Sequence, residues 1–471
     1  MRLESTIKWR DVSGGNIQKV NSDITLPNGI PFSMNLLFDK VLGEAVSREG
    51  TNIVGSQLEA GQACRGLFQH LDSTAANNAL FAAFDTDIYN VLTGASGVGS
   101  LTAADANFAT FLNTTLMLNG SQARSYTAAG GWVANAGLLN VGGVPAGAKF
   151  CQEFKDRMYC TVTDRLYYTN TPTGGQVSWS ASGSGSLQVE QEDGGGTLQA
   201  LNKVPGYLMI YKQRSLKRWN FDSSFPEDLI NIGTQSHKSV VSARGRNYFF
   251  YGLNGFYETS GGYPTRISRP VQRIVEAIAS SFYASVNGWS DNDNIYWSIG
   301  DITIDFDRGF TESYSNVVLR YTIDAQSWSV LKYAHEFRAM NQYISGNDTL
   351  IIGGDTDGQV LQLNTGLVDY PNTAITYILE SPEMDFKNRE KKKTISEKIY
   401  VHSDRTIGAL LQVRLDYGEW KSIGSLKDIV SEVFIQPLTA YVFQFRITDS
   451  ISGEIVKLRG LDIPNVFVFE E

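Results

Sequence analysis

A strand–turn–strand pattern recurs seven times along the middle of this chain of 471 residues. The copies begin at residues 78, 108, 156, 206, 247, 316 and 349, a mean step of about 45 residues, which is the period of a β-propeller blade. In one copy Leu319, Tyr321 and Ile323 alternate with polar residues, as in a half-buried strand. The sequence therefore predicts an all-β fold with a β-propeller of six or seven blades over residues 65–370. An irregular sandwich with many hairpins is the alternative.

The two ends of the chain differ from the repeats. Residues 1–64 are polar and rich in turn residues, so they cannot hold a core of their own. We expect this N-terminal segment to be extended and to contact the rest of the chain or another subunit. Beyond residue 370, a charged run is followed by strands that mix apolar and charged positions, which predicts a small β-sandwich-like domain over residues 371–471.

One segment within the repeats has helical periodicity. Apolar side chains in residues 266–284 recur at the spacing of one helix face. With Ser268 as the candidate N-cap, the sequence predicts one inserted helix near 268–282, outside or on the rim of the propeller. In the neighbouring hairpin, Asn254 and Gly255 are predicted to form a two-residue turn in which both take positive φ.

Charge and hydropathy limit the classes of partner. The formal net charge of -9 argues against binding nucleic acid through clustered lysines and arginines. An acidic channel wall would instead repel DNA and let it slide. No run of 18 apolar residues occurs, so we expect no membrane span and no membrane partner.

The three cysteines are too few for a disulfide framework in a chain of this length. Cys151 and Cys160 could face each other across a hairpin, and Cys64 stands apart from both. A pair of small buried thiols is the favoured interpretation of Cys151 and Cys160.

The sequence predicts no catalytic, cofactor-binding or metal-binding residue, and we expect the chain not to be an enzyme. The four histidines lack metal-ligand spacing and are interpreted as surface or turn residues: His70, His237, His335 and His402. GASGVGS (94–100) lacks the lysine of a phosphate loop, so we interpret it as a flexible blade loop.

Carboxylates come together in FDTD (84–87), IDFDR (304–308) and DTDG (355–358). The last resembles part of a calcium loop but lacks the required glutamate, which favours an Asp-Gly turn. The run REKKK (389–393) is interpreted as a solvated linker, with phosphate or an acidic partner as the alternative.

Aromatic residues are predicted to wedge between blades, with sugar stacking as the alternative. They are Trp179, Trp219, Trp289, Trp297, Trp328, Tyr167, Tyr168, Tyr248 and Phe250.

Two stretches resemble tail-associated propeller proteins of tailed bacteriophages. The first is MNLLFDKVLGEAVSREGT (34–51), with an Asn-containing strand, a Gly turn and an Arg-x-Gly step at Asn35, Gly43, Arg48 and Gly50. The second, over 208–278, has a Gly-Thr-x-Ser turn, a Gly-Phe-Tyr hairpin and a helix opened by Ile-Ser. Its matching residues are Gly233, Thr234, Ser236, Gly255, Phe256, Tyr257, Ile267 and Ser268. Within these proteins, the chain is most similar to the nozzle, or packaged-DNA stabilization, class.

This resemblance implies a structural virion protein located in the phage tail and made in the host cytoplasm. Members of the class form a ring below the portal, extend the DNA channel and help to retain and release the genome. The resemblance implies a ring-shaped homo-oligomer, with a hexamer expected. The other implied partners are the portal or adaptor, other tail proteins, and double-stranded DNA that passes through the lumen without sequence-specific binding.

The alternatives are a tail hub or fibre-attachment propeller, a glycan-binding or glycoside-cleaving propeller, and a host cytoplasmic scaffold.

Overall fold

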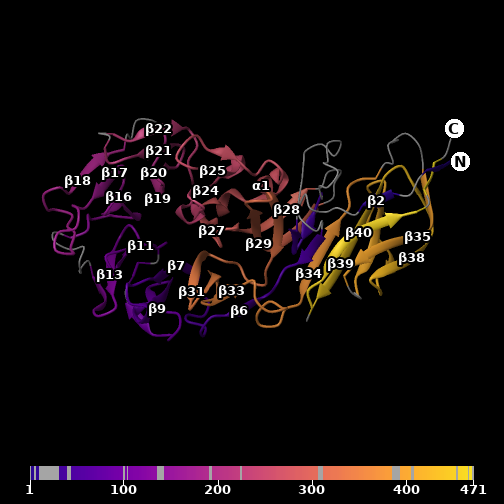
Figure 1. Ribbon diagram of the computed structural model, residues 1–471, viewed down its shortest axis with the longest axis horizontal. Helices are drawn as coiled ribbons and strands as arrows, with labels where there is room; N and C mark the ends of the chain where they lie inside the picture. Colours follow the sequence, from indigo (N-terminus) through magenta and orange to yellow (C-terminus); the bar gives the residue numbers. More distant parts are fainter. Residues whose placement is uncertain are drawn as a thin grey trace.

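A ring of small sheets and a two-sheet sandwich lie side by side in the computed structural model (Figure 1). The structure describes residues 2–4, 7–9, 31–39, 44–98, 101–102, 104–134, 143–189, 194–222, 225–305, 311–384, 393–404, 408–451, 454–464 and 466–468. Within these residues the ring consists of seven four-stranded antiparallel sheets. This part of the chain is a seven-bladed β-propeller.

Six blades are built from four strands that are consecutive in the sequence, so each blade forms through local turns. The blades are β7 (Cys64–His70), β8 (Ala79–Phe84), β9 (Asp87–Asn90) and β10 (Ser96–Val98); β11 (Asn107–Phe111), β12 (Thr114–Leu118), β13 (Ala123–Thr127) and β14 (Gly131–Ala134); β15 (Cys151–Phe154), β16 (Arg157–Val162), β17 (Arg165–Tyr168) and β18 (Gly185–Gln188); β19 (Leu198–Val204), β20 (Tyr207–Lys212), β21 (Leu216–Trp219) and β22 (Glu227–Ile230); β23 (Val241–Ala243), β24 (Arg246–Tyr251), β25 (Gly255–Thr259) and β26 (Thr265–Arg266); β27 (Asn287–Ser290), β28 (Asn294–Asp305), β29 (Thr311–Thr322) and β30 (Ser327–Lys332).

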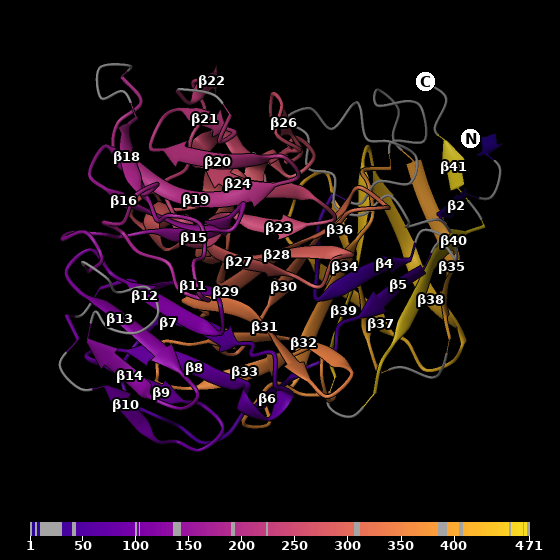
Figure 2. The same ribbon diagram turned by 60° about the vertical axis from the view of Figure 1, so that its left-hand side comes forward.

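The seventh blade closes the ring with a strand from the other end of the chain. Its strands β31 (Ala339–Ser345), β32 (Asp348–Gly354) and β33 (Val360–Leu363) are completed by β6 (Thr51–Ile53). β6 pairs antiparallel with β33, with Ile53 opposite Leu361. Because β6 precedes the first blade, this pairing joins the two ends of the propeller (Figure 2).

The propeller prediction is confirmed, and the structure decides between six and seven blades. Each of the seven hairpins predicted from the sequence falls in a different blade. In five blades the hairpin joins the second and third strands, whereas it joins β11 to β12 in the second blade and β29 to β30 in the sixth. The uneven steps along the chain reflect these differences in position and the long loops between strands.

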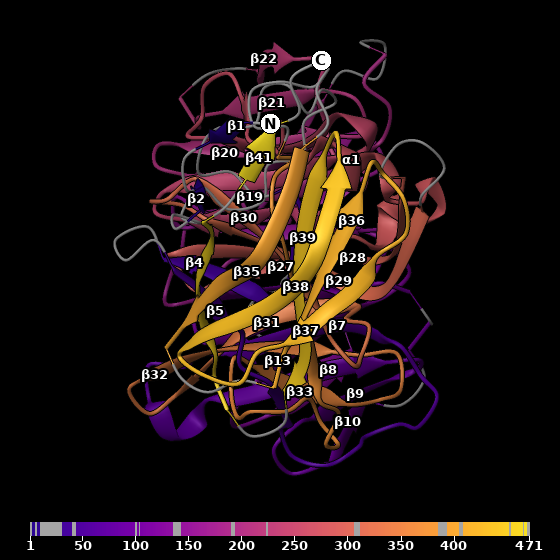
Figure 3. The same cartoon turned by 90° about the vertical axis from the view of Figure 1, so that its right-hand side faces the viewer.

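The sandwich consists of two packed sheets that take strands from both ends of the chain (Figure 3). The eight-stranded sheet contains β1 (Arg2–Glu4), β2 (Ile7–Trp9), β4 (Leu36–Asp39), β5 (Glu44–Ser47), β35 (Lys393–Ser403), β38 (Val430–Ala440), β40 (Lys457–Ile463) and β41 (Val466–Val468). The five-stranded sheet contains β3 (Ser33–Met34), β34 (Ile375–Glu380), β36 (Leu410–Leu415), β37 (Lys421–Ser425) and β39 (Phe443–Ile451). Buried residues of both sheets, such as Ile395 and Phe445, form one shared core.

The described strands of the N-terminal segment belong to this chain's own sheets. β1 pairs with β41, and β2 pairs with β40. Leu36 and Phe38 of β4 lie in the sandwich core, and Phe32 and Met34 pack against the propeller. The segment thus contacts the rest of the chain, as expected, and a further contact with another subunit stays a prediction.

The inserted helix is shorter than the sequence predicts. The α-helix α1 spans Gln272–Ala277, and the 3₁₀-helix η5 (Ser280–Ser285) follows it. Its N-cap is Val271 rather than Ser268, because the Ser268 Oγ accepts a hydrogen bond from the Phe256 backbone N–H instead. The helix buries Ile274 and Val275 against the sixth blade.

The turn predicted at Asn254 and Gly255 is also different. The 3₁₀-helix η4 (Gly252–Asn254) connects β24 to β25, and the positive φ angles are those of its first residue, Gly252 (44°), and of Gly255 directly after it (89°). Two further 3₁₀-helices are η2 (Ala75–Asn77) and η3 (His237–Ser239).

Large aromatic side chains fill the space between blades. Trp297 and Trp328 of the sixth blade are almost fully buried, and their ring centroids lie 4.4 and 5.6 Å from that of Phe256 in the fifth blade. Trp219 packs edge-to-face on Tyr159 of the neighbouring blade.

No helix in the described part of the chain has the length and apolar character needed to cross a membrane.

Candidate functional site

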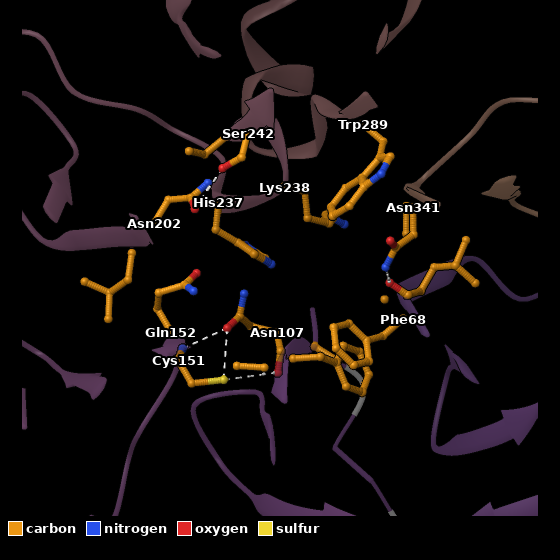
Figure 4. A pocket seen from close by; sticks show the side chains of 18 of the residues that line it. Phe68, Asn107, Cys151, Gln152, Asn202, His237, Lys238, Ser242, Trp289 and Asn341 are labelled. Atoms are coloured by element: carbon orange, nitrogen blue, oxygen red, sulfur yellow. Dashed lines mark hydrogen bonds between the residues drawn. The ribbon is translucent and has the colours of Figure 1, made fainter. Parts of the chain in front are cut away.

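A cavity of about 340 Å³ lies on the propeller axis. The first strand of every blade lines it, and η3 contributes His237 and Lys238. Figure 4 shows Asn107, Gln152 and His237 directed into this space from one side, with Phe68 and Trp289 across from them. We call this feature the axial cavity.

Asn107 connects two blades at the wall of the axial cavity. Its Oδ1 accepts a hydrogen bond of 2.8 Å from the backbone N–H of Cys151, the first residue of β15, and lies 3.3 Å from the Cys151 Sγ. Burial raises the pKa of the Cys151 thiol, so the sulfur stays protonated at neutral pH. The thiol therefore helps to hold the wall together and is a poor nucleophile.

The cationic side chains at the axial cavity are paired with carboxylates. The Lys238 Nζ lies 2.9 Å from the Asp105 Oδ1, and Lys203 forms an ion pair with Glu153 of the preceding blade. Although burial acts to raise the pKa of Asp105, the nearby Lys238 lowers it below its usual range. The pair of Lys203 with Glu153 joins two neighbouring blades, and the pair of Lys238 with Asp105 joins η3 to the segment before β11.

His237 contributes a neutral imidazole. Its Nε2 is buried and has no hydrogen-bond partner among the described residues. Burial lowers the pKa of His237 to about 3, and the positive charge of Lys238 acts in the same direction. At neutral pH the ring is uncharged.

We expect this histidine to make the fold less stable in acid. The unfolded chain takes up a proton near pH 6.5, but folded His237 does so only near pH 3. The contribution of His237 to the free energy of unfolding is fully present above pH 6.5. It falls as the pH drops toward 3, by about 2 kcal/mol between pH 6.5 and 4.5. The measurement is urea unfolding across this range for the wild type and His237→Gln, which should lose less stability in acid.

His335 provides a control of opposite sign. A hydrogen bond to Asp355 raises the pKa of His335 above its usual value. Its contribution is present below the unfolded pKa and is lost as the pH rises through the folded one. His335→Gln should therefore destabilise the protein most in acid. Equal pH profiles for His237→Gln and His335→Gln would contradict both assignments.

The other histidines show where the sequence interpretation was wrong. His70 is fully buried, with its Nδ1 2.8 Å from the Thr115 Oγ1, so it is neither a surface nor a turn residue. His402 lies in β35 with its Nε2 3.2 Å from the Asp462 Oδ2. Within the described ranges, no three His, Cys, Asp or Glu side chains come together as a metal site.

DTDG lies in the turn between β32 and β33. The Asp355 Oδ1 accepts hydrogen bonds from the backbone N–H groups of Asp357 and Gln359, and its Oδ2 lies 2.8 Å from the His335 Nδ1. One carboxylate oxygen of Asp355 thus stabilises the turn, and the other holds His335.

The N-terminal residues that carry the phage resemblance meet at the junction of propeller and sandwich. The buried guanidinium of Arg48 forms two hydrogen bonds with Asp369, of 2.8 and 2.6 Å, and a third of 2.9 Å with the Asn35 Oδ1. It also donates to the Lys332 carbonyl at the end of the sixth blade. We call Asn35, Arg48, Gly50 and Asp369 the junction cluster. Gly43, the fourth matching position, lies outside the described residues.

The second set of resemblance residues lies in the connection from the fourth blade to the fifth, in β25 and directly after β26. The Thr234 Oγ1 bonds the Phe250 carbonyl at 2.9 Å and lies 3.1 Å from the Ser239 Oγ. A Cβ at Gly233 would lie 2.0 Å from the Lys212 carbonyl oxygen, and one at Gly255 would lie 2.1 Å from the Ser268 Oγ. These positions require glycine because two chain segments approach closely there.

The remaining sequence candidates occupy structural positions. Cys151 and Cys160 face each other in register across β15 and β16, and both are buried free thiols, as is Cys64. FDTD forms the turn from β8 to β9, and Ser96–Val98 of GASGVGS form β10, with Gly94 and Ala95 before the strand. Residues 306–308 of IDFDR and 389–392 of REKKK lie outside the described residues. Lys393, expected to be solvated, is buried, and its Nζ donates to the Tyr441 carbonyl.

Sequence reasoning did not identify the axial cavity. Its polar residues come from strands about 45 residues apart, and none forms a recognised motif. One signal was present: the first strands of three successive blades carry an amide, at Asn107, Gln152 and Asn202.

No model of a known protein family and no curated protein matches the chain. Among solved structures, the chain is similar to the computationally designed Ika8 protein, with 10% identity and a TM-score of 0.39, over 68% of this chain and 100% of that one. It is also similar to the AfRom2 CNH domain, with 11% identity and a TM-score of 0.39, over 67% of this chain and 99% of that one. Likenesses this distant do not bear on function.

Proposed function

We propose that this protein is a structural component of a bacteriophage tail, of the nozzle or packaged-DNA stabilization class, and acts through assembly. The observation that carries the proposal is the junction cluster. The N-terminal residues by which the chain resembles this class hold propeller and sandwich together through a buried ion pair and its hydrogen bonds. The residues that carry the resemblance thus also join the propeller to the sandwich.

In this proposal DNA passes between copies of the protein and not through one propeller. A cavity of about 340 Å³ is too small for a duplex whose major groove alone is about 12 Å wide. A ring of several copies, with a hexamer expected, would surround a wider lumen. The net charge of -9 favours a lumen along which DNA slides without binding.

The proposal is tested by quantitative mass spectrometry of purified virus particles from a culture that carries the gene. We expect the chain at a fixed low copy number relative to the portal protein, as in a ring on the tail axis. Electron cryomicroscopy of that axis should then show a seven-bladed propeller in each copy.

Absence of the chain from purified particles would overturn the proposal. The major capsid protein from the same preparation serves as the control for recovery. A full N-terminal truncation is unsuitable as a test variant because the described strands β3 and β4 supply core residues to the fold.

A further inference from the structure

The axial cavity presents hydrogen-bonding groups that the chain itself does not satisfy. The Asn107 Oδ1 is occupied by the Cys151 N–H, and the Asn202 Oδ1 accepts from the Lys203 N–H at 2.8 Å. These contacts fix the orientation of both side-chain amides, which leaves each Nδ2 group as a free hydrogen-bond donor. The Gln152 Nε2 donates to the Glu153 carbonyl, which leaves its Oε1 as an acceptor. No described residue pairs with any of these three remaining groups.

Among the described residues that line the cavity, no charged side chain is left unpaired for an ionic ligand. Lys238 is neutralised by Asp105, and Lys203 by Glu153. His237 is neutral at pH 7 because burial lowers its pKa to about 3. An anion such as phosphate would have to displace a carboxylate from its lysine, and a metal cation would find only neutral amides at the free positions.

The rings of Phe68 and Trp289 stand across the cavity from Gln152 and Asn202 (Figure 4). Phe68 and Phe108 are stacked with centroids 5.4 Å apart, and both are partly exposed in the lining. Trp289, also partly exposed, extends its ring into the same space (Figure 4). Its indole N–H is a third donor without a partner in the described part of the chain.

We infer that the axial cavity is a binding site for one neutral sugar unit. Sugar hydroxyls both donate and accept hydrogen bonds, which suits two amide donors beside an amide acceptor. The apolar face of a sugar ring suits the aromatic side of the cavity. A volume of about 340 Å³ lies at the small end of ligand pockets, which span roughly 300–1,000 Å³, so the site holds a single ring.

The sugar reaches this site directly from solvent. Lys203 and Ser242 line the cavity and are themselves exposed. Ser242 donates to the Asn202 Oδ1 and so lies beside one of the free donors. This inference does not depend on the proposed function, since sugar binding and presence in virions are measured separately.

Saturation-transfer NMR on the full-length protein tests the site, with glucose, galactose, mannose and N-acetylglucosamine as the probes. For the wild type we expect saturation transfer to at least one sugar, with a dissociation constant of the order of 1 mM. Gln152→Met removes the free acceptor and keeps the side-chain volume, so it should weaken binding about 3- to 10-fold. Ser242→Trp should fill the mouth of the cavity and abolish binding.

The matched control is Gln188→Met, on the exposed outermost strand of the same blade as Gln152. It should bind the sugar as the wild type does. The melting temperature of each variant shows whether the fold is kept. The inference is overturned if none of the four sugars shows saturation transfer from the wild type. It is equally overturned if folded Gln152→Met and Ser242→Trp bind as tightly as Gln188→Met.

Discussion

Replacing Arg48 by methionine is expected to lower the free energy of unfolding by about 3–5 kcal/mol, because a buried carboxylate would lose its partner. The Arg48 side chain is 1% exposed and that of Asp369 is 4% exposed. The substitution also removes the Arg48 donor to the buried Lys332 carbonyl and one of the two donors to the Asn35 Oδ1, which keeps its hydrogen bond from the Lys332 N–H. Urea unfolding monitored by tryptophan fluorescence measures the loss.

Two further variants separate the buried ion pair from general effects of the substitution. Arg244 pairs with Asp293 and Asp324 at the surface, where its own side chain is 38% exposed and theirs are 72% and 77% exposed, so Arg244→Met should cost less than about 1 kcal/mol. The double variant Arg48→Met, Asp369→Leu removes both charges of this buried ion pair and should regain about half of the lost stability or more. Similar losses for Arg48→Met and Arg244→Met would show that the junction cluster does not hold the two parts together.

The second large effect is expected for Gly50→Ala, which should destabilise the protein by about 3 kcal/mol. A Cβ at Gly50 would lie 1.9 Å from the carbonyl oxygen of Val368 and 2.8 Å from its nitrogen. Because these atoms belong to backbone, no side-chain rotation relieves the overlap. The Gly50 N–H also donates to the Gly366 carbonyl, so the two segments would have to separate.

Gly262→Ala is the matched control for this substitution. A Cβ there would meet nothing within 4 Å, so the stability should change by less than about 0.5 kcal/mol. Thermal and urea unfolding of both variants give the comparison. If Gly50→Ala unfolds like Gly262→Ala, the contact of the N-terminal segment with residues 366–368 is looser than the structure shows.

The propeller could be predicted because each blade is a local structure. Its strands are joined by short turns, so alternation and turn residues repeat along the sequence with every blade. The blade count could not be settled in the same way. β6 completes the seventh blade from about 300 residues away, and a three-residue strand carries no periodic signal of its own.

The helix prediction failed in its details for a similar reason. Ser268 has the residue type of an N-cap, yet its hydroxyl accepts the Phe256 N–H from the adjacent strand. Local preference for capping is worth about 1 kcal/mol, which a tertiary hydrogen bond can outweigh. Lys393 shows the same effect, because its position in β35 buries a side chain that composition assigns to solvent.

The sequence by itself determined the all-β class and the seven repeated hairpins, because these follow from periodicities of two residues and of one blade. Only the tertiary structure decided which distant residues meet. Arg48 lies 321 residues from Asp369, and Asn107 lies 44 from Cys151. Contacts at such separations depend on how blades and sheets pack, and one-dimensional patterns do not encode that geometry.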